Sequence, residues 1–123
     1  MSSSDELEQF IASSFRSVWA LEVLCALRKA PDFVAAAELV STLRASELIA
    51  GQSLAELAAA GLAEIRADGC ARYAPASAAL KRLADAAEAR YATAPDAVRR
   101  IIVKAANPGV TAFADAFRFK GGK

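Results

Sequence analysis

Histidine is absent from this chain of 123 residues, and its two cysteines, Cys25 and Cys70, lie far apart in the sequence. Histidine is the commonest general base and the commonest metal ligand, so its absence excludes hydrolases built on a Ser-His pair. Two cysteines cannot supply a tetrahedral zinc site. The acidic residues fall on polar helix faces, which favours solvated surface over a catalytic carboxylate pair. We therefore expect no enzymatic activity, no metal and no other cofactor.

Glycine-rich loops and long apolar runs are also absent. The six glycines match neither a phosphate-binding nor a dinucleotide-binding spacing. The densest apolar run, residues 18–27, contains Glu22 and is shorter than the roughly 18 residues that a membrane-spanning helix needs. Residues 1–9 contain Ser, Asp and Glu instead of the basic start and apolar stretch of a signal peptide. These features, with two cysteines in reduced form, predict a cytoplasmic protein without a membrane partner.

The chain has no strong charge of either sign, because 15 basic residues offset 14 acidic ones. A protein that binds nucleic acid by charge alone carries a larger basic excess. Alanine, the best helix former, is the most frequent residue and favours closely packed helices. The length suits one compact core. We predict a single helix-rich domain over residues 1–123.

Hydrophobic spacing places helices along most of the chain. Apolar residues three and four apart predict one long first helix from about Ser4 to Pro31, apolar on almost every side after residue 18. A short extended piece at residues 33–34 and a second helix over 35–43 follow. After a tight turn, Ser46 is a suitable N-cap for a third helix over 47–60, which Gly61 ends. Its predicted inward stripe consists of Ala50, Leu54 and Leu57.

Residues 62–67 and 70–74 predict a β-hairpin. Asp68-Gly69 is a two-residue turn signal, because both turn positions favour positive φ. Two further helices are expected over 77–92 and over 93–106, the second opening at Thr93-Ala94-Pro95. A last short helix over 110–119 would use Phe113 and Phe117 as anchors.

This order of helix, extended piece, helix, turn, helix and hairpin resembles a winged helix. The residues that carry the resemblance are Arg44-Ala45-Ser46, Leu54-Ala55-Glu56-Leu57 and Ala60-Gly61-Leu62, followed by the Asp-Gly turn. With additional N- and C-terminal helices, the chain is similar to small bacterial transcription regulators of the multiple-antibiotic-resistance type. The resemblance covers a core of about residues 15–92, followed by a C-terminal helical extension over about 93–120. It implies a mainly α fold with a small β-hairpin wing, a winged helix-turn-helix.

The resemblance also implies a transcription regulator that binds double-stranded DNA as a homodimer, with the third helix in the major groove and the wing on the backbone. Gln52 would suit an adenine, and Ser53 a phosphate or a base edge. The positions that match DNA-contacting positions of the family are Arg44, Ser46, Gln52, Ser53, Arg66 and Arg72.

An alternative function remains open, because residues 35–74 contain no lysine and are slightly acidic. Phosphate contacts supply most non-specific affinity for DNA, so this composition favours a winged helix used as a protein-protein interaction module. Basic residues gather instead over 80–104 and 118–123, either as a surface for phosphate or an acidic partner or as solvated helix faces. The homodimer interface is expected at the surplus aromatic residues of the terminal helices, Phe15, Trp19, Phe113 and Phe117.

Overall fold

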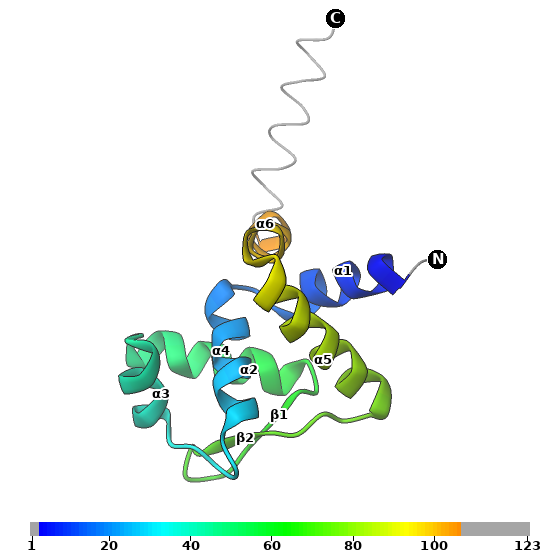
Figure 1. Cartoon of the computed structure of the whole chain (residues 1–123). Helices are drawn as coiled ribbons and strands as arrows, with labels where there is room; N and C mark the ends of the chain where they lie inside the picture. Colours follow the sequence, from blue (N-terminus) through cyan, green and yellow to red (C-terminus); the bar gives the residue numbers. More distant parts are fainter. Residues whose placement is uncertain (1–2, 107–123) are drawn as a thin grey trace, which may run out of the picture.

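The structure is a computed structural model that describes residues 3–106 (Figure 1). Over these residues the chain forms α1 (Ser3–Ser14), α2 (Val18–Lys29), α3 (Ala36–Leu43), α4 (Glu47–Ala59), β1 (Ala63–Ile65), β2 (Ala71–Tyr73), α5 (Ala78–Thr93) and α6 (Pro95–Ala106). The described part is therefore mainly helical with one small antiparallel sheet, as the sequence predicts. The expected helix over 110–119 lies outside the described residues.

The prediction of one long first helix is wrong, because the chain bends by 100° between α1 and α2. Ser17 caps α2, and its hydroxyl accepts a hydrogen bond from the backbone N–H of Ala20 at 3.3 Å. In the break, Phe15 is fully buried and its ring meets Phe10 edge to face at 5.8 Å between centroids. A continuous apolar pattern survives the bend because both helices bury their apolar sides in the same core.

Helix α2 lies at the centre of the molecule and contacts α3, α4, α6 and β2. Its apolar character on nearly every side follows from this position. No single helix between residues 3 and 106 is long and apolar enough to cross a membrane, although α1 and α2 together match that test as a bent pair. The buried residues of α2 are Ala20, Leu21, Val23, Leu24 and Leu27.

A short turn joins α3 to α4. Arg44 ends α3 in the left-handed region, with φ of 56°. Ser46 caps α4 as predicted, accepting a hydrogen bond from the N–H of Ile49 at 3.1 Å. Gly61, with φ of 79°, follows the helix in the predicted left-handed conformation. The predicted inward stripe is confirmed, since Ala50, Leu54 and Leu57 are buried.

The hairpin forms where predicted, but its turn is different. The N–H of Arg66 donates to the carbonyl of Cys70 at 2.8 Å, so the loop contains three residues, 67–69. Gly69 alone in the loop has positive φ, 88°. The Asp68 carboxylate accepts the N–H of Cys70 at 3.0 Å. This arrangement corresponds to the three-residue hairpin loop, in which a type I turn precedes a left-handed glycine.

Two further contacts close the fold. Val34, in the predicted extended piece, pairs with Ala71 of β2 through hydrogen bonds of 2.7 and 2.9 Å. At the other end, α1 packs against both α5 and α6. Val98 and Ile102 of α6 are completely buried. The first and last described helices thus share one core.

Candidate binding surface on α4 and the hairpin

Helix α4 presents a side that carries no charge. Leu48, Gly51, Gln52 and Ala55 are exposed, and their spacing of three and four residues places them on one side of the helix. We call these four residues the α4 surface. Leu48 is 67% exposed, the largest value for any large apolar side chain between residues 3 and 106. A Cβ at Gly51 would meet nothing within 4 Å, so the middle of this surface is open.

The predicted DNA contacts on and beside α4 have different environments. Gln52 belongs to the α4 surface, and Ser46 is exposed but uses its hydroxyl to cap the helix. Ser53 is only 1% exposed, so its prediction as a DNA contact is wrong. One residue further along a helix turns the side chain by about 100°, which places Ser53 on the inward side with Leu57.

Arg44 is exposed in the turn that precedes α4. No carboxylate between residues 3 and 106 forms an ion pair with its guanidinium. Its position beside the start of α4 adds positive charge to the positive end of the helix dipole. Arg44 therefore remains available to an anionic partner.

The two predicted wing arginines lie together on one aromatic ring. The guanidinium carbons of Arg66 and Arg72 are 4.2 and 4.9 Å from the centroid of Phe33. Arg66 pairs with Asp68 at 3.0 Å, and Arg72 pairs with Glu64 across the strands at 2.8 Å. We call these five residues the hairpin cluster. Its two positive and two negative charges cancel.

The hairpin cluster also explains a shifted pKa. The pKa of the Asp68 carboxyl is lowered by the hydrogen bond from the backbone N–H of Cys70 and by the guanidinium of Arg66. Hydrogen bonds to the ionised form favour it. Asp68 thus stays charged beside Arg66, and it competes with a phosphate group for Nε and Nη2 of the arginine. No local pattern in the sequence marks Phe33, because Arg66 and Arg72 lie more than 30 residues away along the chain.

The base of the hairpin is held by Arg28 of α2. Its guanidinium pairs with Asp85 at 2.6 Å and Glu88 at 3.2 Å, both on α5. It also donates to the Tyr73 hydroxyl at 3.2 Å and lies 5.0 Å from the centre of that ring. Because the Arg28 side chain is only 18% exposed, we interpret this cluster as structural. It fixes β2 relative to two helices.

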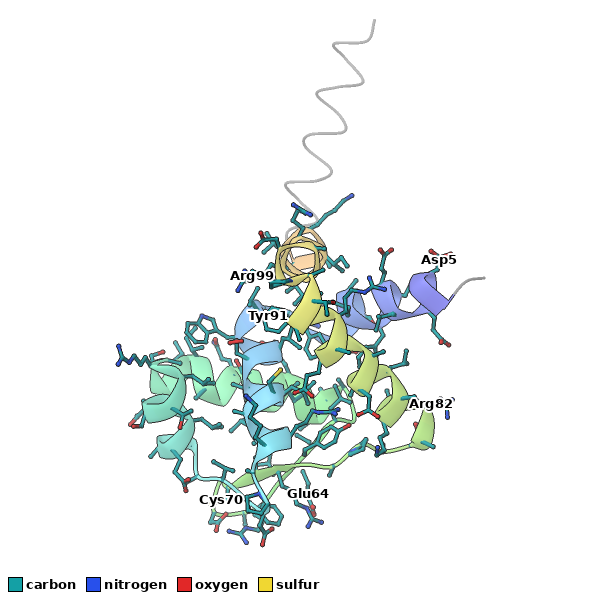
Figure 2. The ribbon with its side chains drawn as sticks, viewed as in Figure 1. Asp5, Glu64, Cys70, Arg82, Tyr91 and Arg99 are labelled. Atoms are coloured by element: carbon teal, nitrogen blue, oxygen red, sulfur yellow. The ribbon has the colours of Figure 1, made fainter. Side chains whose placement is uncertain are left out.

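The basic residues of α5 and α6 are partly neutralised where the two helices meet. Arg99 pairs with Asp96 at 3.0 Å and lies over the ring of Tyr91, as the labelled side chains in Figure 2 show. Lys81 pairs with Asp85 at 3.4 Å. Two of the basic side chains predicted for this region, Arg99 and Lys81, are therefore already paired with carboxylates.

The predicted dimer residues also differ in their exposure. Phe15 has no exposed surface, so its prediction as an interface residue is wrong; its ring packs inside its own chain. Trp19 is 37% exposed and can still contact a partner. Phe113 and Phe117 lie outside the described residues.

Comparison with known proteins gives no relative: no family model, no curated protein and no solved structure matches the chain. Within residues 3–106, no group of three or more Cys, Asp or Glu side chains is placed to hold a metal ion. The surfaces described above must therefore be interpreted from their own geometry and charge.

Proposed function

We propose that this chain is a winged helix that acts as a protein-interaction module and binds a protein through the α4 surface and the hairpin. The winged-helix assignment is supported by the order α2, α3, α4, β1 and β2 and by the pairing of Val34 with β2. In this assignment α3 and α4 form the helix-turn-helix, the hairpin is the wing, and α1, α5 and α6 are additions.

The observation that carries a protein partner is the uncharged α4 surface with Leu48 67% exposed. The centres of protein interfaces are depleted of charged residues, whereas DNA-binding surfaces are strongly basic. Residues 36–73 contain three basic and five acidic side chains. Arg66 and Arg72 are already paired with carboxylates. A protein partner with an apolar groove therefore fits this surface better than the phosphate backbone of DNA does.

The second candidate is a transcription regulator that binds duplex DNA. The turn between α3 and α4 favours it, since Arg44 is exposed without an ion partner among the described residues and Gln52 is exposed one turn or more along α4. Gln52 could contact an adenine edge while Arg44 contacts a phosphate. A homodimer is compatible with either function.

The protein-interaction proposal is tested by site-specific photo-crosslinking in the cells that produce this chain. We expect a photoreactive residue at Leu48 or Ala55 to give one discrete protein adduct, identifiable by mass spectrometry. The same residue at Ala92, which is exposed on α5, is the control and should not give it. Leu48→Glu should remove the adduct formed from position 55, because a charge would enter an uncharged interface. Equal labelling from positions 48 and 92 would contradict the proposal.

A measurement of DNA binding distinguishes the two candidate functions. We expect the fluorescence anisotropy of a labelled random-sequence DNA duplex to show no salt-dependent change when purified protein is added. If it does bind, replacing Arg44, Arg66 and Arg72 with Ala should abolish binding and its salt dependence, because fewer counterions are released. The matched triple variant of Arg99, Arg100 and Lys104 should retain binding. DNA binding that is lost in the first triple variant and kept in the second would support the transcription regulator and reject the protein-interaction proposal.

A further inference from the structure

A groove of about 540 Å³ lies between α1 and α5. Leu7 and Leu83 are among its apolar lining residues. The α5 wall is formed largely by exposed alanines, Ala79, Ala86 and Ala89. Figure 1 shows α1 and α5 spreading apart on the side of the molecule away from α3. Small side chains on a helix allow another helix to approach closely, so the groove suits a helical occupant.

The two walls of the groove carry opposite charges. Glu6 lies on the α1 wall and Arg82 on the α5 wall, and both side chains are exposed. Neither forms an ion pair with any residue between 3 and 106. Figure 2 shows Arg82 projecting from the outer part of α5, beyond the body of the fold. Each wall therefore offers an unneutralised charge to an occupant.

We propose that this groove binds a second copy of the chain, with Glu6 of each copy against Arg82 of the other. In a two-fold symmetric dimer the same surface is used by both copies, so each contact occurs twice. A surface that carries an acid on one wall and a base on the other is complementary to itself under such an axis. Glu6 is the acidic residue of α1 that lines this groove, whereas Asp5 and Glu8 line a separate hollow beside α6.

This interface is independent of the proposed function. It uses α1 and α5, whereas partner binding uses α4 and the hairpin, which Figure 1 places elsewhere on the molecule. It also replaces Phe15 as the dimer contact, because that ring is fully buried. A dimer built in this way presents two copies of the α4 surface to a partner.

The proposal is tested by sedimentation equilibrium on the purified full chain and charge-swap variants. We expect a dimer at micromolar concentration. Glu6→Arg and Arg82→Glu should each weaken dimerisation by at least about tenfold, because each places like charges together twice. Combining both substitutions should restore the dissociation constant to within about threefold of the parent. Glu38→Arg and Arg44→Glu, matched charge changes at exposed positions around α3, should leave it unchanged.

Three outcomes would overturn the proposal. The parent could sediment as a monomer throughout, the single charge reversals could leave the dimer intact, or the double variant could remain as weak as the single ones. Thermal unfolding followed by circular dichroism accompanies each variant. Both positions are exposed, so we expect the single variants to unfold near the parent temperature, and loss of the dimer is then distinguished from loss of the fold.

Discussion

At the residue scale, the two cysteines have very different environments. Cys25 lies on α2, where burial and then the nearby carboxylates of Glu88 and Glu22 raise its pKa to about 12. Cys70 lies in the hairpin beside the loop, where its backbone N–H donates to the Asp68 carboxylate, and both cysteines are partly buried. Both are free thiols. The thiolate is the reactive form of cysteine. Because burial and nearby negative charge disfavour the thiolate, Cys25 should be unreactive as a free thiol.

We predict that a disulfide reagent at about pH 8 modifies one thiol per native chain. With a pKa of about 12, only about one Cys25 thiol in ten thousand is ionised at this pH. The reacting thiol should therefore be Cys70, and Cys70→Ser should abolish the fast phase while Cys25→Ser leaves it unchanged. Denaturant should release the second thiol. Equal rates for both thiols in the native protein would show that the environment of Cys25 is wrongly assigned.

At the element scale, local signals predicted the fold better than long-range ones. Ser46 caps the start of α4 by a hydrogen bond, and Gly61 follows its end with positive φ. Both features depend on nearby residues, and both predictions are confirmed. Ser17 caps the start of α2 in the same way and so interrupts the predicted long helix. The apolar pattern continues across Ser17, so the sequence does not indicate this break. The prediction that Ser53 lies on the exposed side of α4 is wrong, because an error of one residue along a helix moves a side chain to another face.

The hairpin cluster could not be predicted from the sequence in the same way. The sequence predicts Arg66 and Arg72 as DNA contacts from their positions in the hairpin, but each arginine is paired with a carboxylate. Phe33 joins them only because the chain before α3 pairs with β2. This contact depends on tertiary packing, which no spacing rule contains. The place and the lack of net positive charge of the candidate site were therefore predicted, whereas the packing of the two arginines on Phe33 was not.

Two glycines with positive φ, Gly61 after α4 and Gly69 in the hairpin loop, provide a matched prediction. Gly61→Ala and Gly69→Ala both place a side chain at positive φ, which costs about 1–2 kcal/mol. A Cβ at Gly61 would also lie 3.1 Å from Leu80 Cδ1, whereas at Gly69 it would meet nothing within 4 Å. Urea unfolding should show a larger loss for Gly61→Ala. Equal losses would mean that Leu80 moves aside freely.

At the scale of the whole molecule, a few polar contacts join elements that also share the apolar core. Arg28 connects α2, β2 and α5. Tyr91 of α5 donates to Glu22 of α2 at 3.1 Å, and Arg99 of α6 lies over the same ring. Charge-assisted hydrogen bonds are directional, so these contacts fix the angles between helices.

The Arg28 cluster predicts how stability depends on pH. The hydrogen bond from Arg28 lowers the pKa of Asp85, so the folded state favours the ionised carboxylate. This contribution is complete above the unfolded pKa of about 3.9 and is lost as the pH falls through the lower folded value. Asp85→Asn should therefore make the fall in unfolding free energy below about pH 4 shallower. In an Arg28→Met background, the same substitution should have a smaller effect, because only Lys81 still pairs with Asp85.

The packing of α1 against α6 has a consequence for the chain during its synthesis. Helix α1 ends at Ser14 and α6 begins at Pro95, so the synthesis of α1 is complete roughly 4 to 16 seconds before the synthesis of α6 begins. During that interval the apolar side of α1, including Leu7 and Ile11, is without α6 and open to chaperones. A nascent chain halted inside α6 would keep this surface uncovered. The apolar core that α1 and α6 share is thus completed only when the last described helix has been made.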